Sequence, residues 1–266
     1  MRFQYDHDLH IHSCLSGCSN DPKQNKENIL QYALDKKLHT ICVTDHFWDE
    51  TVDVERIDAY YEHNYAKISQ IKPLPQADGV RFLFGCETEL SKDLCLGLSK
   101  ERYDLFDFIV VPTTHLHLVP FTISEADFES TERRAMLWGE RLDAVLNMHL
   151  PFHKTGIAHL TDCLEKPNEL VQTLSKIPLL EAERLFKKAR SVGVGIEINL
   201  ADAMHFVGEA GEYALKIFQI AKDCKCKFYL GSDAHHLNKF DMCPTYFERA
   251  IDLLELTEED KFIPQI

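Results

Sequence analysis

The chain has 266 residues, of which 45% are hydrophobic and 27% are charged, and these values are ordinary for a globular protein with a substantial core. Its formal net charge of −14 argues against broad binding to nucleic acid or to an anionic membrane, because both require a basic surface.

Short apolar segments alternate along the chain with longer segments of helical periodicity. The expected strands cover Phe3–Ile11, Thr40–Thr44, Arg81–Cys86, Phe108–Val111, Gly156–Ala158, Gly195–Ile198 and Phe228–Leu230. The expected helices cover Glu27–Lys37, Val54–Ile71, Glu125–Met148, Leu179–Val192, Glu212–Cys224 and Thr245–Leu254, and Gly193 stands where a C-terminal cap is expected. This alternation is typical of an α/β fold with a parallel sheet. Seven repeats favour a distorted (βα)7 barrel, similar to a TIM barrel, over an open doubly wound sheet.

The sequence also predicts a single domain in a reducing compartment. The loops around Pro73–Gly79 and Pro167 do not read as linkers, so we expect residues 1–266 to form one domain. The N-terminal sequence has no apolar signal core, and no apolar stretch approaches the ~20 residues of a membrane span. Nine scattered cysteines, without the paired spacing of structural zinc sites, fit free thiols in the cytoplasm.

Histidines and acidic residues recur directly after the expected strands. They are His10 and His12, Asp45 and His46, Glu87, His115, His159, Glu197, and Asp233 and His235, in chain order. A lone histidine after a strand is more often a loop or core residue than a ligand. The two pairs are stronger, because residues that alternate along a strand share one face. Since a barrel gathers the carboxyl ends of its strands at one rim, we predict a metal site there.

Five motifs of the sequence resemble those of the polymerase and histidinol phosphatase (PHP) superfamily. They are His10-Ile11-His12-Ser13, Thr44-Asp45-His46, Gly85-Cys86-Glu87, His159 and Gly231-Ser232-Asp233-Ala234-His235, in the order that the superfamily has them. The resemblance extends over nearly the whole chain. It implies a distorted seven-stranded barrel, commonly with three divalent cations, and an activity on phosphoesters.

The same resemblance implies how these residues divide among three metal sites. His10, His12, Glu87 and Asp233 would hold one cation; Glu87 would bridge to a second, completed by His115 and His159; and His46 and His235 would hold a third. Many relatives complete the third site with a histidine shortly after the first motif, but here the region 13–21 contains none. Asp21 is the preferred substitute and Cys18 the second choice. We favour His115 over the neighbouring His117.

Several other polar residues have alternative interpretations. Glu89 shares a strand face with Glu87 and is a weaker bridging candidate, and Asp45 is expected to orient a histidine rather than bind metal. Glu197 and Asn199 are expected to form hydrogen bonds at the barrel mouth. Three basic residues, more often surface charges, are candidates for contact with phosphate: Lys154, Lys239 and Arg133.

Mixed histidine and carboxylate ligands are typical of catalytic rather than structural metal sites. Bound zinc, manganese or iron would lower the pKa of water from ~15.7 towards ~7 and neutralise phosphate oxygens, so we expect hydroxide to attack phosphorus. Glu87, Asp233 and His235 are the expected catalytic residues. The predicted substrate is a small phosphomonoester such as histidinol phosphate or a nucleoside monophosphate. The alternatives are a 3'-5' exonuclease or phosphodiesterase, an amide or lactone hydrolase, and a metal-binding partner module without catalysis.

Overall fold

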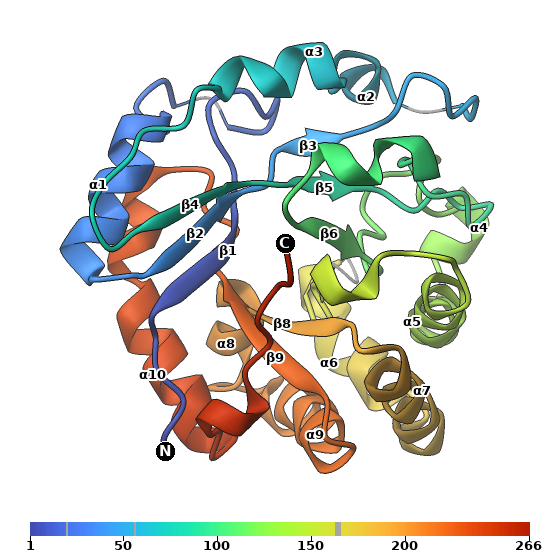
Figure 1. The fold of residues 1–266 in the computed structure, drawn as a ribbon. Coiled ribbons are helices and arrows are strands. Elements are labelled where there is room, and N and C mark those ends of the chain that lie inside the picture. Colours follow the sequence, from blue (N-terminus) through green and yellow to red (C-terminus); the bar gives the residue numbers. More distant parts are fainter. Residues whose placement is uncertain (20, 56, 163–165) are drawn as a thin grey trace.

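Parallel strands form the centre of the molecule, and helices surround them (Figure 1). The computed structural model describes residues 1–19, 21–55, 57–162 and 166–266. The strands are β1 (His7–Ile11), β2 (Thr40–Val43), β3 (His46–Phe47), β4 (Arg81–Phe84), β5 (Cys86–Thr88), β6 (Ile109–Pro112), β7 (Thr155–Ala158), β8 (Gly195–Asn199) and β9 (Lys227–Gly231).

The helices mostly connect one strand to the next. They are α1 (Lys26–Lys36), α2 (Asp58–Glu62), α3 (Tyr65–Ile68), α4 (Glu125–Phe128), α5 (Thr131–Leu146), α6 (Leu170–Ser175), α7 (Leu179–Val192), α8 (Leu200–His205), α9 (Gly211–Asp223) and α10 (Cys243–Leu253). Helix α7 ends at Gly193, which adopts a left-handed conformation (φ 80°) as a C-terminal cap, as predicted.

All strand pairs in the two sheets are parallel, which confirms the predicted α/β class. One sheet has the order β1-β2-β4 and the other β3-β5-β6-β7-β8-β9. Only Gly85 separates β4 from β5, so the first sheet continues into the second. The outer strands β1 and β9 also meet, because the Asp233 amide donates to the His10 carbonyl at 2.7 Å and the His12 amide to the Ala234 carbonyl at 3.2 Å. A closed barrel of seven repeats stays a prediction.

Side chains that point inward from the strands fill the space that the two sheets enclose. This inner core consists of Leu9, Cys42, Leu83, Phe108, Val110, Ala158, Tyr229 and Phe262. Phe262 comes from the C-terminal tail, whose amide at this residue donates to the Phe228 carbonyl at 2.7 Å. The tail therefore covers the amino ends of the strands, at the centre of Figure 1. The carboxyl ends are left for the site.

Two of the predicted helices are broken in the structure. The helix expected over Val54–Ile71, of which residue 56 lies outside the described part, is replaced by α2, α3 and a 3-10 turn. The Asn64 side chain accepts from the Lys67 amide at 3.1 Å and starts α3 afresh. The helix expected over Glu125–Met148 divides into α4 and α5, because the Ser130 hydroxyl caps α5 at the Arg133 amide. Polar residues that cap helices interrupted an otherwise continuous apolar periodicity.

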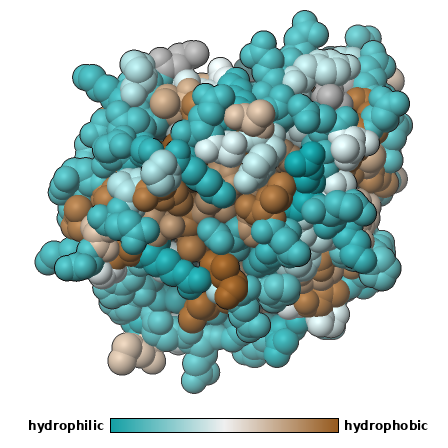
Figure 2. Space-filling model, turned by 45° about the horizontal axis from the view of Figure 1, so that its top comes forward, coloured by the Kyte–Doolittle hydropathy of each residue, from teal (hydrophilic) through white to brown (hydrophobic). Residues whose placement is uncertain are grey.

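None of the described helices is long and apolar enough to cross a membrane. The face of the molecule in Figure 2 is mainly hydrophilic, with smaller hydrophobic areas between the polar side chains. This agrees with the 27% of charged residues.

Candidate metal centre

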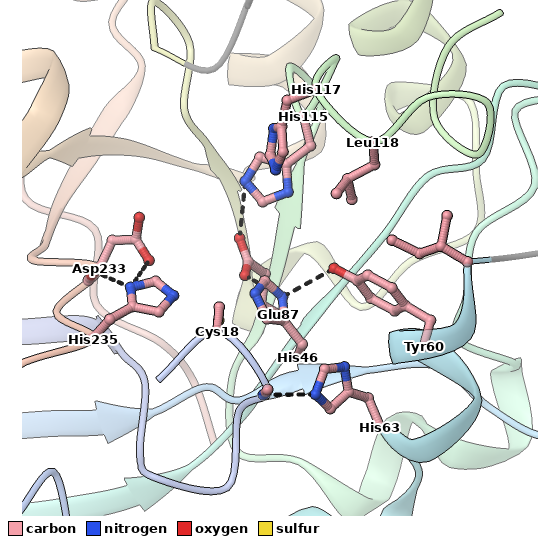
Figure 3. Close-up of a pocket in the computed structure, with 12 residues that line it drawn as sticks. Cys18, His46, Tyr60, His63, Glu87, His115, His117, Leu118, Asp233 and His235 are labelled. Atoms are coloured by element: carbon pink, nitrogen blue, oxygen red, sulfur yellow. Dashed lines mark hydrogen bonds and ion pairs between the residues drawn. The ribbon is translucent and has the colours of Figure 1, made fainter. Parts of the chain in front are cut away.

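A cavity lies at the carboxyl ends of the strands, and five of the predicted ligands line it: His46, Glu87, His115, Asp233 and His235 (Figure 3). The cavity has a volume of about 380 Å³, which is within the range of small-molecule sites. Its lining residues are Gly17, Cys18, His46, Ile57, Tyr60, His63, Glu87, His115, His117, Leu118, Asp233 and His235. Pairing of β3 with β5 places His46 directly beside Glu87 in the sheet.

The Glu87 carboxylate lies at the centre of the ligand cluster and is fully buried. Its Oε1 lies 3.5 Å from Nε2 of both His10 and His159 and 3.7 Å from Nε2 of His115. Its Oε2 lies 3.3 Å from His12 Nε2 and 2.8 Å from His46 Nδ1. Within the described residues neither oxygen has a hydrogen-bond partner. A buried carboxylate normally needs such partners or a metal, so this arrangement fits a cation.

Asp233 is the second acidic residue of the cluster. Its Oδ1 lies 3.0 Å from His12 Nε2 and 3.6 Å from His10 Nε2, and its Oδ2 lies 3.7 Å from His159 Nε2. Ligands about 2.0–2.1 Å from a tetrahedral zinc ion lie about 3.4 Å from one another, close to these spacings. Asp233 and His159 also adopt left-handed backbone conformations, with φ of 50° and 59°.

Hydrogen bonds on the far side of the imidazole rings leave Nε2 of several histidines available as a ligand. His10 Nδ1 donates to Glu197 Oε1 at 2.7 Å, and His115 Nδ1 donates to Glu89 Oε1 at 2.8 Å. His235 Nδ1 donates to the Asp233 carbonyl at 2.9 Å. Because Nδ1 is the donor in each case, Nε2 is the nitrogen that would bind a cation once it has lost any proton it carries.

His12 is oriented through a short chain of hydrogen bonds that ends at Asp45. His12 Nδ1 lies 2.9 Å from Ser16 Oγ, and the Ser16 hydroxyl donates to Asp45 Oδ1 at 2.8 Å. Asp45 also accepts from the Ser13 amide and hydroxyl, both at 2.7 Å. Because the serine hydroxyl donates to Asp45, its oxygen accepts from His12 Nδ1. Asp45 thus orients a histidine, in the way the sequence suggested.

The structure groups the predicted ligands much as the resemblance implied. His10 and Asp233 lie with His159 in one potential metal-binding group and His10 lies with His12 and Glu87 in another. Glu87, His115 and His159 form a third group, and His12, Cys18, His46 and His235 a fourth. The donor atoms of each group lie within 4.8 Å of one another. Glu89 belongs to a further group with His46 and Glu87.

Asp21 is the one predicted ligand that the structure does not bring to the cluster. Its carboxylate accepts from the Lys23 amide at 2.9 Å, in a turn beyond the cavity. The chain between β1 and α1 instead turns so that Cys18 reaches the cavity wall (Figure 3). Cys18, the second choice for the third site, therefore lies where Asp21 was expected.

Other polar residues fall where the sequence left alternatives open. His115 lies among the ligands, while His117 lines the cavity with its ring centroid 4.9 Å from that of His115. Lys154 is buried and donates to the carbonyls of Tyr103 and Phe106, so it does not face the cavity. Arg133 pairs with Asp127 and Glu140 on helices α4 and α5, and Lys239 is exposed.

Two polar cavity residues, Tyr60 and His63, were not predicted to be part of the site. The Tyr60 hydroxyl donates to Glu89 Oε1 at 2.6 Å and lies 3.2 Å from His46 Nδ1. His63 Nε2 accepts from the Gly17 amide at 2.8 Å. Both residues lie in or beside α2, in a segment whose periodicity indicated an ordinary amphipathic helix.

The charges of the cluster shift the pKa values of its members. Burial favours neutral His10 and His46, but the neighbouring carboxylates outweigh it and raise the pKa of both rings well above the usual value. The pKa of His12 is raised to about 9 by Asp233 and Glu87, although burial and His46 oppose the shift. Burial would raise the pKa of Cys18, but His235 and His46 lower it to about 5. The cluster therefore holds protons that a cation would displace.

The fold is similar to that of histidinol phosphatase structures. One is the histidinol phosphate phosphatase of Lactococcus lactis in complex with zinc, L-histidinol and phosphate, with a TM-score of 0.52 and 16% identity over 92% of this chain and 93% of that chain. Another, a candidate histidinol phosphatase of Listeria monocytogenes, has a TM-score of 0.62 and 14% identity over 88% of this chain and 96% of that chain. No protein-family model and no curated protein matches the sequence. The predicted resemblance to the PHP superfamily is thus confirmed at the level of the fold.

Proposed function

We propose that this protein is a metal-dependent phosphatase that hydrolyses a small phosphomonoester. The observation that carries the proposal is the Glu87 carboxylate, which is fully buried, has no hydrogen-bond partner in the described structure and lies among five imidazoles. Such a group is a poor structural element but a good bridging ligand, since two oxygens can serve two cations. The fold of the zinc-containing phosphatase from Lactococcus lactis supports the same interpretation.

The ligands would divide among three divalent cations. His10, His12, Glu87 and Asp233 would hold the first, and Glu87, His115 and His159 the second. His46 and His235 would hold the third. When bound, zinc, manganese or iron would lower the pKa of water and neutralise phosphate oxygens. Glu87, Asp233 and His235 act in the reaction through the cations that they hold.

The residues that line the cavity indicate how a phosphate group would be bound. Among the lining residues that the structure describes there is no lysine or arginine, so a phosphate group would have to be bound by cations. Tyr60, His63 and His117 offer aromatic rings and hydrogen-bonding groups to the rest of the substrate, and Ile57 and Leu118 add apolar surface to the cavity wall. The volume of about 380 Å³ suits a small molecule such as histidinol phosphate or a nucleoside monophosphate.

We infer a distorted barrel of seven βα repeats and a single domain over residues 1–266. Hydrogen bonds between the β1 and β9 ends support the barrel, and an inner core that contains both Leu9 and Phe262 supports one domain.

The test is phosphate release from a panel of metabolite phosphomonoesters by protein that has been stripped of metal and then supplied with zinc, manganese or iron. We expect release that a chelator abolishes and that Glu87→Gln lowers by at least about 100-fold, since several ligand contacts are lost. Parallel esterase, amidase and lactonase assays test the other hydrolases, and an oligonucleotide substrate tests the exonuclease. Activity in one of those assays without phosphate release, or no activity with any cation, would refute the proposal.

A further inference from the structure

We propose that the Cys18 thiolate is a ligand of the third cation, and that this ligand makes the third site prefer thiophilic metals such as zinc over manganese. The inference rests on the proposed function in one respect, namely that the cavity holds divalent cations. It departs from the sequence prediction, which preferred a carboxylate at Asp21 for this place.

Cys18 lies within a group of four potential donor atoms. Its Sγ and one nitrogen each of His12, His46 and His235 all lie within 4.8 Å of one another. In Figure 3 the Cys18 side chain points toward the space between His235 and His46. The His12 and His235 rings are stacked with centroids 4.2 Å apart, so that both rings face the same space. A zinc–sulfur bond of about 2.3 Å and zinc–nitrogen bonds of about 2.1 Å could be formed here by small side-chain movements.

Hydrogen bonds on both sides of Cys18 fix the loop in this position. The Gly17 amide donates to His63 Nε2 at 2.8 Å, and the Ser19 hydroxyl donates to the His235 carbonyl at 2.8 Å. Before them, Ser16 is held between His12 and Asp45. The residues next to Cys18 are therefore tied to other parts of the cavity wall, which aims the thiol before any cation is bound.

The neighbouring contacts also indicate how many ligands the third site has. His12 Nε2 lies 3.0 Å from Asp233 Oδ1 and 3.3 Å from Glu87 Oε2, so its lone pair is directed at the first site. His46, His235 and Cys18 are then left for the third cation. Three protein ligands with one open position are typical of a catalytic site, whereas four would close it. The open position is where a phosphate oxygen of the substrate would bind.

The donor set determines the metal preference. Thiolates select zinc, iron and copper(I), while oxygen ligands suit manganese and magnesium. With Asp21 as ligand, the third site would accept manganese well; with Cys18 it would not. The first two sites contain only histidine and carboxylate ligands and have no such preference, so the sites would differ in metal content.

Cobalt(II) substitution tests the ligation without reference to activity. Metal-stripped protein titrated with cobalt(II) is expected to develop a near-ultraviolet thiolate-to-cobalt charge-transfer band. Cys18→Ser should lose this band, while Cys14→Ser, an exposed cysteine on the same loop outside the donor groups, should keep it. Zinc should also protect Cys18 from alkylation by iodoacetamide, as measured by peptide mass spectrometry. The mass measurement uses the unaltered protein and therefore stands even if a variant fails to fold.

Metal selectivity gives the second readout. Cys18→Ser should weaken zinc binding at one site by at least about 10–100-fold, because loss of even a hydrogen-bond partner of a metal ligand has an effect of this size. Manganese binding should stay nearly unchanged. Cys18→Asp should restore binding with manganese favoured. A band that survives Cys18→Ser, or zinc-loaded protein in which Cys18 alkylates as fast as in the metal-free form, would overturn the inference. Phosphate release, measured in parallel, separates this inference from the proposed function. Phosphate release without Cys18 ligation would overturn only the inference, and Cys18 ligation without phosphate release would overturn only the proposed function.

Discussion

Replacement of Glu197 by glutamine tests whether the hydrogen bonds behind the histidines hold the metal site in its binding form. Glu197 is fully buried and accepts with both oxygens: Oε1 from His10 Nδ1 at 2.7 Å, and Oε2 from the Asn199 side chain at 3.1 Å and the His159 amide at 3.3 Å. A glutamine side chain has one acceptor and one donor end. At least one of the three donors must therefore face the NH2 group.

Either orientation of the amide disturbs a ligand. If the new NH2 group faces His10, the ring must move its proton from Nδ1 to Nε2, the atom that faces Glu87 and Asp233. If the NH2 group faces the His159 amide, this amide loses its hydrogen-bond acceptor, at a residue whose backbone is left-handed. Loss of a hydrogen bond to a charged group costs about 1.5–3 kcal/mol, which corresponds to about 10–150-fold in affinity. Removal of an outer partner of a metal ligand costs about 10–100-fold, so the two estimates agree.

The measurement is zinc affinity by competition with a chromophoric chelator, with phosphate release as a second readout. We expect Glu197→Gln to bind zinc about 10–100-fold more weakly while keeping its circular dichroism spectrum. Glu209→Gln, an exposed residue with the same change of charge, is the matched control and should bind as the unaltered protein does. Equal zinc affinity in Glu197→Gln and Glu209→Gln would refute the reasoning, because it would mean that the state of His10 does not depend on Glu197.

Three further predictions concern the backbone, the protons and the stability of the site. A Cβ at Gly231 would overlap the Glu197 carboxylate and lie 2.7 Å from His10 Cβ, so Gly231→Ala should lower both the thermal midpoint and zinc affinity; an unchanged midpoint would contradict this. The pKa of His12 is about 9 in the metal-free site, and an imidazolium ion cannot bind metal, so zinc affinity should rise with pH up to about 9. Zinc binding should also release protons, which calorimetry in buffers of different ionisation enthalpy would measure. Arg141 is buried and donates to four backbone carbonyls, so Arg141→Met should lower the free energy of unfolding by about 3 kcal/mol, as measured by denaturant unfolding. Arg133→Met, at a partly exposed residue of the same helix, is the control and should lower it by less than about 1 kcal/mol.

The sequence predicted those parts of the site that depend on strand periodicity. His10 and His12 differ by two positions at the end of β1, a spacing that directs both side chains to one face. Asp233 and His235 have the same spacing in the turn after β9. Because parallel strands present their carboxyl ends at one edge, Glu87 and the remaining histidines were expected to lie near these pairs. These inferences needed only the direction of each strand, which short apolar segments indicate well.

The residues that the sequence did not place correctly come from loops and short helices. Asp21 and Cys18 are three positions apart in the loop after β1, and no periodic pattern decides which of them faces the cavity. The choice follows from long-range hydrogen bonds, such as that from the Ser19 hydroxyl to the His235 carbonyl. Tyr60 lies in the short helix α2, which Asn64 separates from α3 where the sequence indicated one continuous helix. Contacts of this kind join distant parts of the chain and leave no local signal.

The charge of the candidate site bears on how an acidic protein would bind the anionic substrate that we propose. The chain has a formal net charge of −14, and the cavity region contains the carboxylates of Glu87, Glu89 and Asp233. With the Cys18 thiolate these groups carry four negative charges, which protonated His10, His12 and His46 offset only in part in the metal-free cavity. Three divalent cations would displace those protons, supply six positive charges and leave a net charge of +2 at the place where phosphate would bind. Phosphate binding should therefore depend on the cations themselves, so that inorganic phosphate inhibits or protects only the metal-loaded protein; binding of equal strength to the stripped protein would show that residues other than the metal ligands attract it.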